Sequence, residues 1–243
     1  DVPDADVDAS CLLASVLKED TLAMRINGHR ALTEEQEKAF DALCDRRAAR
    51  EPLQYILGET EFMGLTFHVE PGVLIPRADT EILVEKALKV MPPNARVLDI
   101  GTGSGCIAIS LAKHLPEAEV AAVDISPEAL AVAEENARMN QVSVSFHELD
   151  ILSEGYSSFM QEKQNFHVRE TRFSCTRNKI FTYVKLKSHT EETEASLIGS
   201  LNCIVSNPPY IMYREKATME ANVLENEPHL ALFVPDDDPL LFY

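Results

Sequence analysis

The residues with the clearest chemical meaning are Asn207-Pro208-Pro209-Tyr210, which directly follow the apolar run 201–206. That run is short, largely apolar and bounded by a double proline, so we expect a buried strand. The turn would then lie at the carboxyl end of a strand, where open α/β sheets bind their ligands. Two prolines supply no backbone N–H, and Asn207 adds a side-chain carbonyl oxygen. The turn therefore offers hydrogen-bond acceptors, which suit a planar NH2 group held by its hydrogens.

A glycine-rich loop follows another apolar run and opens a predicted helix. The residues that we predict to bind a ligand there are Asp99, Gly101, Thr102, Gly103, Ser104 and Gly105. Glycines allow the backbone to turn tightly and to approach a ligand closely. The spacing is GxGxG, not the GxGxxG of dinucleotide folds, and no phosphate-binding lysine follows, so we reject a P-loop. Asp99 could bind a cationic amino group or cap the following helix.

Two further carboxylates end the next two predicted strands. Asp124 is placed to bind two ribose hydroxyls, although it could instead favour the start of the next helix. Asp150 could accept a hydrogen bond from an adenine amino group and Ile151 could pack on the ring, but an ordinary strand-end aspartate and a core isoleucine fit equally well. With the glycine loop, these residues predict a nucleoside pocket without a phosphate clamp. S-adenosyl-L-methionine fits, because it joins adenosine to a zwitterionic amino acid, and its methyl would face Asn207.

Three stretches of the chain, 74–81, 97–105 and 204–211, together resemble the HemK/PrmC family. Members of that family are class I S-adenosylmethionine-dependent methyltransferases with a Rossmann-like, doubly wound sheet. The resemblance implies methylation of the glutamine side-chain nitrogen in the Gly-Gly-Gln loop of class 1 peptide-chain release factors, with S-adenosyl-L-homocysteine as product. It also implies a helical N-terminal domain that helps to dock the release factor. Ala78 departs from the family, which usually has proline there.

The resemblance assigns roles to individual residues. The cofactor contacts that it implies are Gly101 through Gly105, Asp124, Ile151 and Asn207, and the substrate contacts are Asn207, Pro208, Pro209 and Tyr210. Asn207 Oδ1 and the Pro208 carbonyl would accept the two amide hydrogens, so these two residues are the expected catalytic pair. Tyr210 would wall the glutamine, or fill a hydrophobic space under the turn. Because a sulfonium methyl is already activated, we expect positioning rather than a strong base to drive transfer.

An alternation of strands and helices positions these residues. The predicted strands are 97–100, 120–123, 142–146 and 201–206, and the predicted helices are 106–114 and a segment from the Ser126 N-cap to about 139. This alternation predicts an α/β protein with a parallel, doubly wound sheet. About thirty residues follow Tyr210, so we expect the last strands of a complete sheet to be missing from this sequence. We therefore expect either a truncated sheet or another element that covers the open edge of the fourth strand.

Three segments make up the expected domain organisation. Residues 1–50 read as a helical domain, with a first helix at 10–17 and a second that starts at a Thr33–Gln36 capping box; the first residue is not Met, which leaves open an incomplete start. Residues 51–75 predict a β-hairpin linker with strands at 55–58 and 65–69. Residues 76–243 predict the methyltransferase domain, with a helix that ends near 91.

That domain carries a basic-leaning surface insertion at about 153–199. We expect a hairpin there or a partly disordered segment, either as a solvated loop or as a basic finger for RNA or an acidic partner.

Composition limits the partners and the compartment. The net charge of −18 disfavours nucleic-acid phosphates, so no direct DNA binding is expected. Five scattered cysteines without a Cys-x-x-Cys spacing predict neither disulfides nor a metal site, which suggests a reducing compartment, most simply the cytoplasm. No run approaches 18 apolar residues, and the acidic start lacks the basic region of a signal peptide.

Two other functions remain open. An exocyclic base amine is also a planar NH2 group, so the chain could methylate amino groups of RNA or DNA bases. Alternatively, it could be an inactive, truncated remnant that keeps the motifs.

Overall fold

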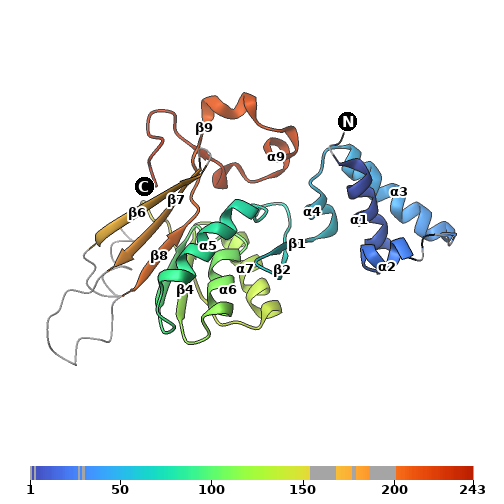
Figure 1. Ribbon diagram of the computed structural model, residues 1–243. Helices are drawn as coiled ribbons and strands as arrows, with labels where there is room; N and C mark the ends of the chain where they lie inside the picture. Colours follow the sequence, from blue (N-terminus) through green and yellow to red (C-terminus); the bar gives the residue numbers. More distant parts are fainter. Residues whose placement is uncertain are drawn as a thin grey trace.

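The computed structural model describes residues 2, 4–26, 28, 31–153, 168–176, 179–186 and 201–242. Figure 1 shows a helical N-terminal region to one side, a central sheet flanked by helices, and a C-terminal segment above helix α5 (Ala78–Val90).

The N-terminal region consists of α1 (Ala5–Leu17), α2 (Thr21–Ile26) and α3 (Glu34–Ala48). The predicted capping box at the start of α3 is confirmed: Gln36 N donates to Thr33 Oγ1 at 3.3 Å, and Thr33 N donates to Gln36 Oε1 at 2.9 Å. Helix α1 starts five residues before its predicted start at residue 10. Arg47 Nε on α3 donates to Asp8 Oδ2 on α1 at 2.7 Å, and both side chains are largely buried. This ion pair joins the first and third helices.

The link to the sheet consists of α4 (Leu53–Leu57), β1 (Glu59–Phe62) and β2 (Leu65–His68). The strand predicted at 55–58 is wrong, because most of that segment belongs to a short helix. Pro52 precedes the helix with extended backbone, and Gly58 ends it with a φ of 77°, which favours glycine. The aromatic and β-branched residues that suggested a strand are buried in this turn of helix instead.

A two-residue turn joins β1 to β2. Met63 and Gly64 have φ angles of 52° and 71°, the signature of a type I′ turn, which matches the twist of paired strands. The predicted hairpin is therefore present, but its first strand lies at 59–62. Asn136 of α7 (Pro127–Asn140) holds the hairpin: its Oδ1 accepts from His68 N at 2.6 Å, and its Nδ2 donates to His68 O at 3.0 Å.

The central sheet follows the predicted alternation. Its elements are β3 (Arg96–Ile100), α6 (Cys106–His114), β4 (Glu119–Asp124), α7, β5 (Ser145–Glu148) and β8 (Cys203–Ser206). The strand order is β5-β4-β3-β8-β7-β6, and the first four strands are mutually parallel. The strand predicted at 142–146 starts later, at Ser145, after the turn that ends α7. This is the Rossmann-like α/β architecture that the sequence predicts.

The β8 edge is covered by a hairpin. Strands β6 (Val168–Thr176) and β7 (Lys179–Leu186) are antiparallel to each other, and β7 pairs antiparallel with β8, with Tyr183 opposite Val205. Of the two possibilities for the fourth strand, the covering element is the one observed. The predicted insertion thus contributes two strands to the sheet. The described part of the chain leaves out residues 154–167, 177–178 and 187–200. The possible basic finger for RNA or an acidic partner falls in this segment and stays a prediction.

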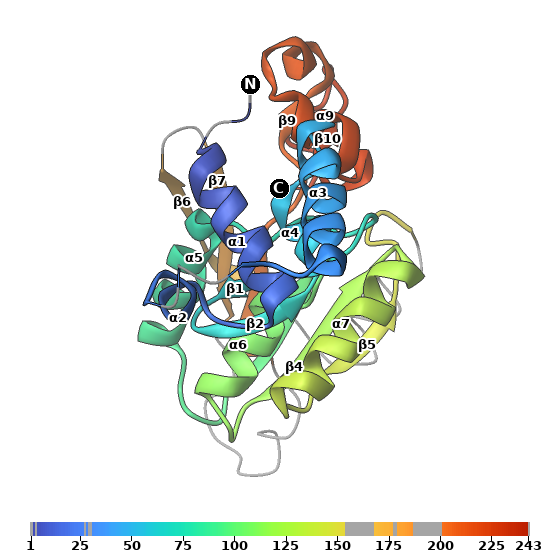
Figure 2. The same cartoon turned by 90° about the vertical axis from the view of Figure 1, so that its right-hand side faces the viewer.

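Helices α5, α6 and α7 pack together with the sheet around one large core. Figure 2 shows α6 and α7 side by side over β4 and β5. Residues of this core come from all three helices and from alternate positions of the strands, for example Val84, Leu111, Ala137, Val97 and Val205. Successive right-handed crossovers that advance in one direction place their helices on the same face. After β5 the chain reverses direction and returns to β8 beside β3, which creates a switch point in the strand order.

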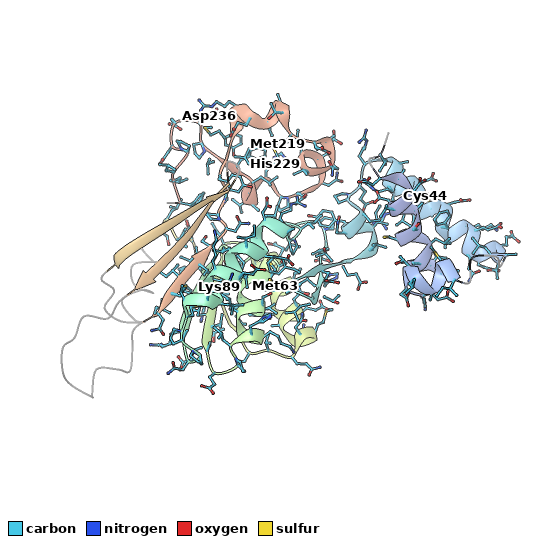
Figure 3. The ribbon with its side chains drawn as sticks, in the orientation of Figure 1. Cys44, Met63, Lys89, Met219, His229 and Asp236 are labelled. Atoms are coloured by element: carbon cyan, nitrogen blue, oxygen red, sulfur yellow. The ribbon has the colours of Figure 1, made fainter. Side chains whose placement is uncertain are left out.

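The C-terminal segment consists of β9 (Ile211–Met212), η1 (Tyr213–Thr218), α9 (Ala221–Asn226), η2 (His229–Ala231) and β10 (Phe233–Val234), and β10 pairs with β9. The rings of Tyr213 and His229 pack on Phe233 with centroid distances of 5.3 and 5.2 Å. Figure 3 shows His229 within this segment. These contacts make the segment a small folded unit next to the Asn207 turn.

Candidate active site

The glycine loop and the Asn207 turn leave the same edge of the sheet. In the parallel pairing, Ile100 at the end of β3 lies beside Ser206 at the end of β8. Ser206 Oγ donates to the Ile100 carbonyl at 2.7 Å, which fastens the two strand ends together. Gly101 and Asn207 therefore start from adjacent points, at the switch point where such sheets bind ligands.

Glycines shape the loop between β3 and α6 for two different reasons. Gly103 has a φ of 55°, and its N–H donates to Asp124 Oδ2 at 2.8 Å, so the loop is tied to the end of β4. Gly105 has a φ of 81°, and a Cβ there would lie 2.8 Å from Ile109 Cδ1 and 3.1 Å from Ala133 Cβ. The first glycine permits the loop to turn so that its N–H reaches the Asp124 carboxylate, and the second permits α6 and α7 to pack closely.

Asp99 lies beneath the glycine loop and is fully buried. Its Oδ2 accepts from Thr102 Oγ1 at 2.7 Å and from Ala108 N, in the first turn of α6, at 3.3 Å. Burial raises the pKa of Asp99 to about 7, against the hydrogen bonds from these two residues, which lower it. Of the two predicted roles, these contacts match the helix cap, so Asp99 supports the loop from below.

A cavity of about 350 Å³ opens above the loop, within the usual range for ligand sites. The predicted cofactor residues that line it are Gly101, Thr102, Gly103, Ser104, Asp124, Ile151 and Asn207; Asp99 and Gly105 do not. Asp124 carries a carboxylate whose Oδ1 accepts from Ser126 N at 3.0 Å. Ile125, which is half exposed, and Ile151 supply apolar surface from the loops after β4 and β5.

Arg77 is the only basic side chain among the described residues that line this cavity. Its Nη2 forms an ion pair with Glu227 Oε1, and the Glu227 side chain is almost fully buried. A phosphate group would therefore meet no unpaired cation here. The lining suits a nucleoside with a carboxylate for its hydroxyls, and the residues present fit S-adenosylmethionine.

A second cavity of about 220 Å³ adjoins the first. The residues that line both are Leu74, Arg77, Thr80, Asn207, Pro208 and Ala231. Of the other predicted substrate residues, Pro209 lines only the larger cavity and Tyr210 only the smaller one. Asn207 and Pro208 thus form part of the wall that the two cavities share.

Asn207 presents an unpaired acceptor at that wall. Its Nδ2 donates to Thr80 Oγ1 at 3.3 Å, while its Oδ1 is buried and has no hydrogen-bond partner. An unsatisfied buried acceptor costs about 1–3 kcal/mol. A ligand that donates a hydrogen bond to Oδ1 would remove this cost.

The C-terminal segment forms a roof over both cavities, and Glu227 fastens it. Besides the ion pair with Arg77, Glu227 Oε2 accepts from Ile75 N at 3.3 Å. The residues that follow it, Pro228, Leu230 and Ala231, line the larger cavity. Tyr55 packs nearby, where its hydroxyl donates to Val73 O at 2.6 Å. Burial, and after it the charge of Glu227, raises the pKa of Tyr55.

Two family models match parts of this chain. Residues 1–58 match the PrmC N-terminal domain and residues 92–224 match a methyltransferase domain. The release factor glutamine methyltransferase of Geobacter sulfurreducens is 38% identical over 95% of this chain and 67% of its own length. The chain belongs to the release factor glutamine methyltransferase family. The relatives of that name from Flavobacterium psychrophilum and Bacteroides thetaiotaomicron are 45% and 42% identical over 80% and 86% of this chain. The chain spans 56% and 61% of their lengths.

In this family member, three site residues escaped prediction from the sequence: Arg77, Thr80 and Glu227. Arg77 and Thr80 belong to the stretch 74–81, one of the three on which the family resemblance rests. Nothing in that stretch indicates their hydrogen-bond partners, Glu227 and Asn207, which lie 150 and 127 residues away along the chain. Glu227 is a single carboxylate in a polar stretch, and no spacing distinguishes it.

The described residues contain no group of three or more His, Cys, Asp and Glu side chains that could hold a metal ion. The helices in the part of the chain that the structure describes are too short or too polar to cross a membrane.

Proposed function

We propose that this chain transfers a methyl group from S-adenosyl-L-methionine to the side-chain nitrogen of the glutamine in the Gly-Gly-Gln loop of class 1 peptide-chain release factors. The observation that carries the proposal is the buried, unpaired Asn207 Oδ1 in the wall between two cavities. The names of the curated relatives support the release factor as substrate.

The larger cavity would hold the methyl donor. When bound, S-adenosylmethionine supplies an electrophilic methyl group, and its transfer leaves the electron pair of the broken C–S bond on sulfur. Asp124 would accept hydrogen bonds from the ribose hydroxyls, since each of its oxygens accepts only one backbone N–H and keeps a further lone pair. Ile125 and Ile151 would pack on the adenine ring, and the glycine loop would contact the amino-acid part.

The smaller cavity would hold the glutamine. Its amide nitrogen is weakly nucleophilic, because the lone pair is delocalised into the carbonyl. Asn207 Oδ1 and the Pro208 carbonyl would each accept one amide hydrogen, which holds the nitrogen in line and favours its pyramidal form. As the N–C bond forms and the C–S bond breaks, the nitrogen would lose one of these hydrogens as a proton to solvent. Placement of this kind is worth roughly 7–11 kcal/mol when the reacting atoms are near attack distance. Tyr210 would close the smaller cavity beside the glutamine.

The proposal is tested by mass spectrometry of a recombinant release factor after incubation with this chain and S-adenosylmethionine. We expect one added methyl group on the glutamine of the Gly-Gly-Gln loop. A release factor with alanine in place of that glutamine is the control and should stay unmodified. An unmodified release factor together with methylated ribosomal RNA or DNA would overturn the assignment in favour of a base-amine methyltransferase.

Calorimetry separates the proposal from a remnant without activity. We expect the chain to bind S-adenosylmethionine; a folded chain without measurable binding would contradict the proposal. We also propose the cytoplasm as the compartment, because the five scattered cysteines suit a reducing environment.

A further inference from the structure

The amide group of Asn207 has two ends with different surroundings. Its Nδ2 reaches Thr80 Oγ1 at 3.3 Å, whereas its Oδ1 is buried and unpaired. An asparagine whose amide turned by about half a revolution would place a donor where the proposed reaction needs an acceptor. A neighbouring group must therefore hold this amide in place.

Thr80 is placed to do so. It lies in the first turn of α5, and only 3% of its surface is exposed. Its backbone N donates to Arg77 O at 2.9 Å, so the residue belongs to a rigid helix start. Its side chain lines both cavities next to Asn207. As a β-branched residue in a helix, threonine has few side-chain orientations, which limits the positions that the hydroxyl can take.

We propose that Thr80 is a positioning residue. It anchors the Nδ2 end of the Asn207 amide, so that Oδ1 stays directed toward the amide of the substrate glutamine. This inference rests on the proposed function and adds a residue to its site. Thr80 touches neither reacting atom; it acts by accepting a hydrogen bond from Nδ2. The loss of this contact leaves the peptide turn in place but frees the amide to rotate.

The matched variants are Thr80→Val, which keeps the shape and removes the hydroxyl, and Thr80→Ser, which keeps the hydroxyl. Because a misplacement of about 1 Å can slow a reaction roughly 100-fold, we expect Thr80→Val to lower kcat between about 10- and 100-fold. The KM for the release factor and the Kd for S-adenosylmethionine should stay near the values of the unchanged chain. Thr80→Ser should recover most of the lost kcat. Thr66→Val, on the exposed face of the β1–β2 hairpin, controls for the loss of a threonine hydroxyl.

A kcat for Thr80→Val equal to that of the unchanged chain would overturn the inference. So would an equal loss in Thr80→Val and Thr80→Ser, since packing rather than the hydroxyl would then be responsible.

Nuclear magnetic resonance gives a readout that does not depend on the substrate. The side-chain NH2 signals of Asn207, assigned by their loss in Asn207→Ala, should shift in Thr80→Val and stay nearly unchanged in Thr80→Ser. Unchanged signals in Thr80→Val would contradict the inference. If the unchanged chain leaves the release factor unmodified, the proposed function fails, while these signals still decide whether Thr80 holds the amide.

Discussion

The two halves of the proposed site, the donor half for S-adenosylmethionine and the acceptor half for the glutamine, are built in different ways. The donor half extends from the glycine loop to the end of β5. It uses backbone groups and contacts over shorter stretches of sequence, such as the hydrogen bond from Gly103 N to Asp124, 21 residues apart. The acceptor half uses side chains brought together from distant segments, 127 residues apart for Asn207 and Thr80 and 150 for Arg77 and Glu227. Substitutions in the donor half should therefore change folding and cofactor affinity, and those in the acceptor half should change transfer.

The largest expected effect separates the halves most clearly. Asn207→Ala removes the buried acceptor, and by analogy with lost oxyanion donors it should cost roughly 3–4 kcal/mol in the transition state, or 100- to 1,000-fold in kcat. Affinity for S-adenosylmethionine, measured by calorimetry, should be nearly unchanged. Asn222→Ala on α9, outside the lining of either cavity, is the control. Turnover by Asn207→Ala at the rate of the unchanged chain would remove the distinction between the halves.

Asp99 offers a test of the donor half through pH. The folded chain raises the pKa of Asp99 to about 7 from an ordinary value of 3.8. The protonated carboxyl of Asp99 therefore contributes fully to the unfolding free energy below pH 3.8. This contribution is lost as the pH rises through about 7. Asp99→Asn cannot lose a proton. The unfolding free energy of the unchanged chain minus that of the variant should fall by about 4 kcal/mol between about pH 4 and pH 8. Urea unfolding at several pH values measures it, and a difference independent of pH would refute the assignment.

Gly105 tests whether the stability of the donor half depends on close packing between α6 and α7. Gly105→Ala places a Cβ 2.8 Å from Ile109 and forces an L residue to a φ of 81°, so we expect a loss of about 2–3 kcal/mol in unfolding free energy. A thermal melt should show a lower Tm. Gly103→Ala is the comparison, because its Cβ would meet nothing within 4 Å. That variant should lose less stability and should bind S-adenosylmethionine more weakly, since Gly103 lines the cavity. Equal stability losses in the two variants would contradict the packing argument.

Glu227→Gln should have the smallest effect of the four. The variant removes the charge that pairs with Arg77, but Arg77 is about one-third exposed, so solvent screens the loss. We expect the unfolding free energy to fall by about 1–2 kcal/mol. The kcat/KM for the release factor should also fall, because the C-terminal segment that covers the acceptor half is held less firmly. The pKa of Tyr55 should fall as well, since the nearby negative charge raises it. Glu225→Gln, exposed in the last turn of α9 just before Glu227, is the control. Similar values for the two variants would show that the C-terminal segment does not depend on Glu227.

The same contrast explains what could be predicted from the sequence. The order β3-α6-β4-α7, the Ser126 N-cap and the glycine loop came out as predicted, because each depends on neighbouring residues. The segment 55–57 was misjudged because its side chains favour strands, whereas Pro52 and Gly58 confine it to one helical turn.

The acceptor half resisted prediction for a physical reason. The Asn207 turn itself was recognised, but its partner Thr80 and the latch between Arg77 and Glu227 are tertiary contacts that no local pattern encodes. The position of β6 and β7 in the sheet also depends on a long-range choice, namely which strand edge the hairpin joins.

The position of β8 has a consequence for how the chain acquires its site. This strand lies inside the sheet, between β3 and β7, although it is the last of the three to be made. The first three parallel strands and their helices can therefore assemble before residue 203 leaves the ribosome, whereas the acceptor turn takes its place only when β8 docks beside β3 and β7. The part of the larger cavity that Gly101 to Ser104, Asp124 and Ile151 line would then form earlier in biosynthesis than the wall that the two cavities share.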